Sequence, residues 1–66
     1  MQLLINGDPA TLQEGLHLEG LLAFYKLRKD QVVVEVNRAV PPKDAYAGIF
    51  LKEGDEIEIV KFLGGG

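Results

Sequence analysis

Cysteine is absent from this chain of 66 residues, and histidine occurs only once, as His17. Without cysteine, the fold has no disulfide and no thiolate that could bind a metal. A single histidine can form neither a metal site by itself nor a Cys–His catalytic pair. We therefore expect no metal site and no catalytic side chains, and any sulfur chemistry must take place on a group other than a side chain.

Basic residues and long apolar runs are also scarce. Seven Lys and Arg against ten Asp and Glu give a net charge of −3, which leaves no basic face to neutralise nucleic-acid phosphates. No apolar run is long enough to span a membrane, and the first residues lack the charged region of a signal peptide. We expect a soluble cytoplasmic protein that binds neither nucleic acid nor membrane.

What the chain does contain is the composition of one small globular domain. Its residues are 47% hydrophobic and 26% charged. A chain of this length buries only about 60% of the surface that its unfolded form exposes, so its core is small. The predicted division is a folded domain over residues 1–63 and a flexible glycine tail over residues 64–66.

The first residues predict a β-hairpin. Alternation over residues 1–6 places three apolar side chains on one face: Met1, Leu3 and Ile5. Asn6-Gly7-Asp8 indicates a tight turn, because Asn and Gly tolerate positive φ. Residues 9–13 would return as an edge strand, since Pro9 has no N–H for a sheet ladder.

A helical pattern follows. Apolar residues at i, i+3, i+4 and i+7 line one face: Leu18, Leu21, Leu22 and Tyr25. Glu19 in the first turn and three basic residues in the last would suit the helix dipole: Lys26, Arg28 and Lys29. The N-cap is poor, His17 is a surface or helix-start residue, and Gly20 costs up to about 1 kcal/mol relative to alanine. Packing rather than propensity must hold this helix.

The second half predicts two further strands. Residues 32–37 bury alternate valines, and residues 56–62 direct Ile57 and Ile59 inward. Between them we expect one helical turn in residues 43–48, a short extended piece over 49–51 and a turn at 52–55. A single main helix can lie across one face of such a sheet. The predicted fold is an α+β roll, with a mixed sheet of four or five strands.

The face of the sheet opposite the helix should be polar, but its pattern is partly apolar. The same alternation places four hydrophobic side chains there: Leu4, Val33, Val60 and Phe62. Isolated surface hydrophobic residues are common, but two of these come directly before the glycine tail. We interpret the four as a partner-docking patch that orients the tail. A nearby acidic set is expected to be solvated and could steer a basic partner: Glu53, Asp55, Glu56 and Glu58.

The sequence ends in Gly64-Gly65-Gly66. Three residues can extend by roughly 10 Å at about 3.3–3.6 Å each, and glycines have no side chains to pack. One interpretation is a frayed end, which is common at chain termini. The other is a working arm.

Several stretches together resemble the ThiS family, the sulfur carriers of thiamine (thiazole) biosynthesis with the ubiquitin-like β-grasp fold. The matching stretches are residues 34–41 (VEVNRAVP), Tyr46, residues 51–60 (LKEGDEIEIV) and the final Gly65-Gly66. Each is weak alone, but their joint order over the whole chain is specific.

The resemblance implies a carrier and not an enzyme. Gly66 would be adenylated by a ubiquitin-activating-like adenylyltransferase that uses ATP, and the carrier itself would bind no cofactor. A persulfide sulfur donor such as a cysteine desulfurase would convert the adenylate to a thiocarboxylate, which would supply thiazole synthase. Gly64 and Gly65 would thread the tail into narrow active sites, because only a chain without side chains fits there.

Two other functions remain open at this point. The chain could carry sulfur for molybdopterin or another pathway, although the molybdopterin carrier typically has a Pro-Pro element before its diglycine, and residues 59–63 contain no proline. It could also be a ubiquitin-like interaction module without a covalent role, or a modifier attached to lysines. An enzyme is disfavoured, because the sequence has no acid–base pair, metal cluster or phosphate loop.

Overall fold

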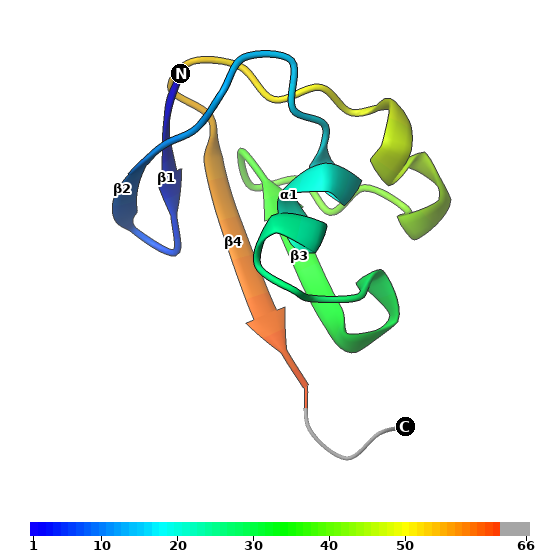
Figure 1. The fold of residues 1–66 in the computed structure, drawn as a ribbon. Helices are drawn as coiled ribbons and strands as arrows, with labels where there is room; N and C mark the ends of the chain where they lie inside the picture. Colours follow the sequence, from blue (N-terminus) through cyan, green and yellow to red (C-terminus); the bar gives the residue numbers. More distant parts are fainter. Residues whose placement is uncertain (63–66) are drawn as a thin grey trace.

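A computed structural model describes residues 1–62 (Figure 1). Over these residues the chain forms four strands, one α-helix and two 3-10 helices. In order they are β1 (Gln2–Ile5), β2 (Asp8–Thr11), α1 (Leu18–Phe24), η1 (Lys29–Gln31), β3 (Val32–Val36), η2 (Lys43–Gly48) and β4 (Glu56–Lys61).

The four strands form one mixed sheet in the order β2-β1-β4-β3. β1 pairs antiparallel with β2 and parallel with β4, and β3 pairs antiparallel with β4. α1 crosses one face of the sheet (Figure 1). This confirms the predicted α+β roll, with four strands and a single main helix.

The first hairpin has the predicted turn. Asn6 and Gly7 both have positive φ, 52° and 83°, and they join Ile5 to its antiparallel partner Asp8. Two such residues in a row form the turn whose twist matches a β-hairpin. β2 is an edge strand, as the proline predicts, but it covers Asp8–Thr11 and not residues 9–13.

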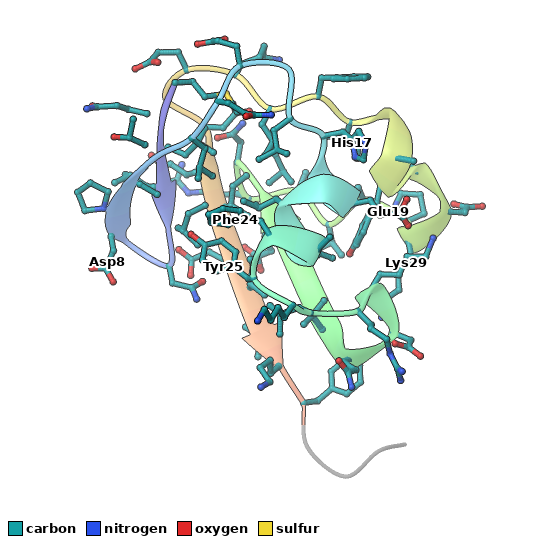
Figure 2. All side chains as sticks on the ribbon, viewed as in Figure 1. Asp8, His17, Glu19, Phe24, Tyr25 and Lys29 are labelled. Atoms are coloured by element: carbon teal, nitrogen blue, oxygen red, sulfur yellow. The ribbon has the colours of Figure 1, made fainter. Side chains whose placement is uncertain are left out.

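The helix is shorter than predicted, and its two ends correct three expectations. The N-cap is not poor: His17 Nδ1 accepts a hydrogen bond of 3.0 Å from the Gly20 N–H, at the start of α1 (Figure 2). Because α1 ends at Phe24, its last turn holds no basic residue. Tyr25 is the C-cap and is 41% exposed, so the buried face ends at Leu22.

The early end of α1 has a local cause. Lys26 has a φ of 60°, and its N–H donates to the Ala23 carbonyl while the Leu27 N–H donates to the Leu22 carbonyl. These two bonds form a Schellman cap, which satisfies carbonyls at the end of a helix and turns the chain away. The basic residues assigned to the helix therefore lie in the connection to β3.

The core lies between α1 and the sheet. Leucines of α1 pack against alternate residues of β1, β3 and β4, and Tyr46 of η2 closes the edge beside β3. The buried hydrophobic residues are Leu3, Leu18, Leu21, Leu22, Val32, Val34, Tyr46, Leu51 and Ile57. β1, β3 and β4 each contribute predicted inward residues, whereas β2 contributes no buried residue, so the alternation read from the sequence is confirmed for those three strands.

No helix among the described residues is long and apolar enough to cross a membrane.

Candidate functional site

The predicted site has two parts, and the structure describes one of them. Gly64, Gly65 and Gly66 lie outside the described residues, as does Leu63 at the end of the predicted domain. The predicted docking patch lies within the described part: its strand residues Leu4, Val33 and Val60 lie on the face of the sheet away from α1, and Phe62 follows the end of β4.

All four patch residues have substantial exposure. The exposed fractions are 38% for Leu4, 42% for Val33, 60% for Val60 and 43% for Phe62. Val33 and Val60 are direct partners across β3 and β4. They therefore form an apolar pair close to the end of β4.

The other two patch residues lie apart from this pair. Leu4 is the partner of Glu56, four residues before Val60, which is about 13 Å along a strand at roughly 3.3 Å per residue. The Phe62 ring lies 5.3 Å from Lys43 Nζ, a cation–π contact with η2. The four residues are exposed as predicted, but Leu4 is not contiguous with Val33 and Val60.

Acidic side chains occupy the space between Leu4 and the valine pair. Glu35 and Glu58 are direct partners across β3 and β4, and Glu56 follows on the same face of β4. Like charges directly opposite each other cost stability, so this row is unfavourable for the isolated fold. Its position beside an apolar pair suits a partner surface that combines basic and apolar groups.

Asp55 does not belong to that solvated row, which corrects the sequence interpretation. It is only 7% exposed. Its Oδ1 accepts from Asn37 Nδ2 at 3.0 Å, and its Oδ2 accepts from the Lys52 N–H at 2.8 Å. Asp55 thus joins the turn before β4 to the turn after β3, because a buried carboxylate needs such donors.

Two asparagines hold β4 from opposite sides, a role that the sequence analysis missed. Asn37 Oδ1 accepts from the Glu56 N–H at 3.0 Å, on the β3 side. On the β1 side, Asn6 Oδ1 accepts from the Ile59 N–H at 2.7 Å, and Asn6 Nδ2 donates to the Ile59 carbonyl at 3.2 Å. Both asparagines have positive φ, which directs each side chain back toward β4. The only available signal was their turn-forming residue type.

Buried Tyr46 anchors η2 beside β3. Its side chain is 1% exposed. Burial raises the pKa of its hydroxyl above the ordinary 10.0, and a hydrogen bond with the Val34 main chain and the charge of Lys29 partly oppose the shift. The hydroxyl therefore stays neutral at physiological pH and serves a structural purpose.

No metal centre is evident in the part of the chain that the structure describes, where no three potential ligands among His, Cys, Asp and Glu come together. Within residues 1–62, the candidate site is the central strand β4 with an exposed apolar pair and an acidic row on one face.

The sequence model of the ThiS family matches residues 3–66. The chain belongs to the ThiS family. The match includes both the folded body and the glycine residues that lie outside the described structure.

Solved structures and curated proteins agree with this assignment. A crystal structure of the thiamine biosynthesis protein ThiS from Geobacter metallireducens superposes with a TM-score of 0.83 at 36% identity, and each chain is covered completely. Because the fold of that ThiS protein matches over the whole chain, the predicted β-grasp fold is confirmed. The sulfur carrier protein ThiS of Bacillus subtilis is 43% identical over 59 residues, 89% of this chain and 80% of that protein.

A third relative has a different length. A thiazole synthase of Magnetococcus marinus is 41% identical over the 66 residues of this chain, but these residues cover only 20% of that protein. A thiazole synthase of Paramagnetospirillum magneticum shows the same relationship at 38% identity and 20% of its length. In these two proteins, a domain similar to this ThiS-family chain shares one polypeptide with a much larger part.

Proposed function

We propose that this chain is a sulfur carrier in thiamine biosynthesis whose working group is the carboxyl of Gly66. The observation that carries the proposal is the match of the ThiS family model through residue 66. The body supports it as a mount: β4 lies between β1 and β3 and ends at Lys61, close to the glycine residues.

The first step is activation. A carboxylate is an anion at neutral pH and a poor electrophile. A carboxylate oxygen of Gly66 attacks the α-phosphorus of ATP on a ubiquitin-activating-like adenylyltransferase, and pyrophosphate leaves. The acyl-adenylate then has AMP as its leaving group.

The second step introduces sulfur. The terminal sulfur of a protein persulfide, such as that of a cysteine desulfurase, attacks the acyl carbon and AMP leaves. A second thiol then cleaves the sulfur–sulfur bond, so the thiol pair is oxidised to a disulfide and Gly66 keeps one sulfur as a thiocarboxylate. Thiazole synthase takes this sulfur, and the acyl carbon regains an oxygen. In this scheme the chain is a co-substrate, and the catalytic groups belong to its partners.

The exposed face of the sheet gives the partners a surface to recognise. Val33 and Val60 supply apolar contact, and Glu35 and Glu58 select a basic surface. Binding there would hold the body while Gly64 and Gly65 thread the tail toward ATP. Leu4 and Phe62 would lie toward the margins of this contact.

Intact-mass measurement tests the proposal. The chain is incubated with ATP, the adenylyltransferase and a persulfide donor, and we expect the mass change of one oxygen replaced by one sulfur at Gly66. A variant with one alanine appended after Gly66 is the control, and it should stay unmodified. An unchanged mass of the original chain under conditions that modify a known ThiS carrier would refute the proposal.

A further inference from the structure

The second half of β4 has a neighbouring strand on only one side. β1 pairs with β4 at Leu4 and Ile5 and then turns away at Asn6. β3 continues beside β4 as far as Lys61. Figure 1 shows the hairpin of β1 and β2 ending partway along β4, while β3 follows β4 further toward its end.

The alternation of hydrogen bonds identifies the open group as Lys61. Toward β1, the Asp55 and Ile57 carbonyls accept from main-chain N–H groups, and the Asn6 side chain takes both main-chain groups of Ile59. On the β3 side, the Phe62 N–H donates to the Gln31 carbonyl, and the Glu56 carbonyl accepts from the Asn37 N–H. Lys61 therefore directs its N–H and carbonyl toward the β1 side, where neither group has a hydrogen-bond partner within residues 1–62.

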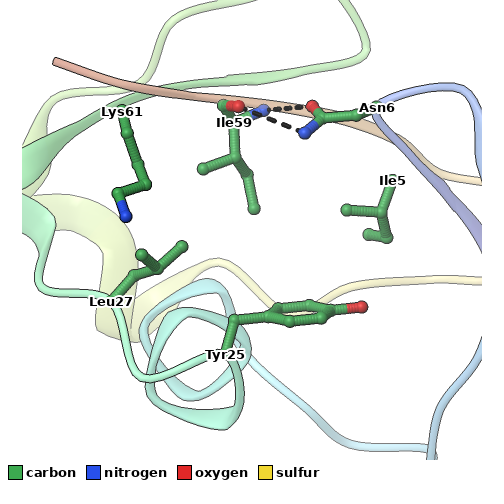
Figure 3. Close-up of a pocket in the computed structure, with 6 residues that line it drawn as sticks. All are labelled: Ile5, Asn6, Tyr25, Leu27, Ile59 and Lys61. Atoms are coloured by element: carbon green, nitrogen blue, oxygen red, sulfur yellow. Dashed lines mark hydrogen bonds between the residues drawn. The ribbon is translucent and has the colours of Figure 1, made fainter.

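An apolar pocket of about 280 Å³ lies beside this open edge. It is lined by Ile5, Asn6, Tyr25, Leu27, Ile59 and Lys61, and Figure 3 shows their side chains around it. A pocket of this size beside an open sheet edge can receive an apolar side chain of an added strand. It exists because α1 ends at Phe24 and leaves the last inward residues of β4 uncovered.

We propose that an extended segment of thiazole synthase adds to the sheet at this edge, in the place that β1 vacates. Its main chain would bond to the N–H and carbonyl of Lys61, and an apolar side chain would enter the pocket. Strand addition of this kind obtains affinity from main-chain hydrogen bonds and specificity from side-chain pockets. An acidic residue on the segment would meet the Lys61 ammonium, which has no ion pair among residues 1–62.

Two observations favour this occupant. Relatives named thiazole synthase, from two organisms, carry a domain similar to this chain within the same polypeptide. Lys61 also comes shortly before Gly64 in the sequence. A strand paired with Lys61 would therefore fix the direction in which the tail leaves the body. The inference rests on the proposed function for the identity of the partner.

Hydrogen exchange of individual amides tests the strand addition. The full chain is measured by NMR alone and with thiazole synthase from the same genome. We expect the Lys61 amide to exchange about tenfold more slowly in the complex, because it gains a hydrogen bond worth roughly that factor. The Val60 amide, already directed to Val33, is the internal control and should change far less.

Substitutions test the pocket and the edge separately. Tyr25→Ala removes one wall of the pocket and should weaken binding about fivefold to tenfold, because an apolar contact is lost. Phe50→Ala is the control, since Phe50 is an exposed aromatic outside the pocket, whereas the ring of Phe24 packs against Tyr25. Lys61→Pro removes the open N–H without removing a bond to β3, so it should weaken binding of thiazole synthase. Lys61→Ala is its control, because it keeps that N–H and should bind more tightly than Lys61→Pro.

The outcomes are distinguishable. If a complex forms but Lys61 exchange is unchanged and Tyr25→Ala binds like Phe50→Ala, strand addition is wrong while the sulfur-carrier function stands. If no complex forms, the choice of thiazole synthase is wrong and the strand-addition proposal fails with it. Thiocarboxylate formation at Gly66, measured by intact mass, then still reports separately on the activation steps.

Discussion

The side chain of Asn6 replaces a peptide group opposite Ile59. It accepts from the Ile59 N–H at 2.7 Å and donates to the Ile59 carbonyl at 3.2 Å, at the point where β1 turns away from β4 (Figure 3). The amide thereby extends the parallel pairing by one residue. It also marks where the paired edge of β4 ends and the open edge at Lys61 begins.

Two substitutions of Asn6 should distinguish the stability that its side-chain hydrogen bonds contribute from the cost of the positive φ in the turn. Asn6→Gly keeps the positive φ of 52° accessible but removes both hydrogen bonds, and we expect a loss of about 1–2 kcal/mol in unfolding free energy. Asn6→Ala should lower the unfolding free energy by about 1 kcal/mol more, because alanine adopts a positive φ only at a cost. Urea denaturation of the three proteins measures both steps. Equal stability of Asn6→Gly and the parent protein would show that the bridge contributes nothing.

The C-terminal cap of α1 predicts a stabilising substitution. Lys26 occupies the left-handed position of the Schellman cap with a φ of 60°, which a residue with a Cβ adopts at a cost of about 1–2 kcal/mol. Lys26→Gly relieves that cost and loses part of the gain to its freer unfolded chain, so we expect about 1 kcal/mol more stability. Lys26→Ala, which also loses the charge but keeps the Cβ, is the control and should not stabilise. If the denaturation midpoint rose for both variants, the loss of the Lys26 charge would explain the effect, and the positive φ would not.

Tyr46 predicts a loss of stability at alkaline pH. Its pKa is raised above 10.0 by burial, so between the unfolded and folded pKa values the native state holds a proton that the unfolded state releases. Stability therefore falls as pH rises above about 10, by at most about 1.4 kcal/mol per pH unit from this group. Below pH 10 the effect is absent.

The phenylalanine variant isolates this contribution. Tyr46→Phe loses the hydrogen bond with the Val34 main chain and should be about 1 kcal/mol less stable at pH 8. Because it cannot ionise, the difference between the two proteins should shrink as pH rises from 9 to about 11. Other titrating groups are common to both proteins and cancel in the difference. A constant difference over this range would contradict the raised pKa.

Local patterns in the sequence predicted the fold well where the relevant contacts are local or periodic. The alternation that buries Val34 and exposes Val33 is confirmed, and Asn6-Gly7 forms the predicted turn. The β-grasp fold and the proposed role of the diglycine end came instead from the ThiS resemblance, and the strand order was not predicted. Periodicity cannot determine which strands pair, because each strand shows only which of its faces is buried.

The sequence predictions were wrong or silent where a residue's structure depends on contacts that hydrophobic periodicity does not show. Asp55 resembles its solvated neighbours in sequence, but it is buried because Asn37, 18 positions away, donates to it. The helix pattern continues through Tyr25, yet α1 ends earlier because the Lys26 backbone turns to positive φ. The open edge at Lys61 depends on where β1 ends relative to β4, and that register is not visible in either strand alone.

The exposed valine pair leads to the last prediction. Val60 is 60% exposed and is paired with Val33 on the open face of the sheet, whereas Val40 is 62% exposed but lies after β3, outside the sheet. Val60→Asp should weaken binding of the adenylyltransferase about tenfold, because it places a charge in an apolar contact and adds to the acidic row of Glu35 and Glu58.

Val40→Asp is the matched control, since it adds the same charge at a valine of equal exposure. Leu4→Asp should have the smaller effect of the two patch variants, because Leu4 lies about 13 Å along the strands from Val60. Titration calorimetry measures the affinities, and circular dichroism verifies that each variant is folded. Equal affinities for the Val60 and Val40 variants would mean that the partner docks elsewhere, whereas an equally strong effect at Leu4 would extend the contact along the whole face and across the acidic row.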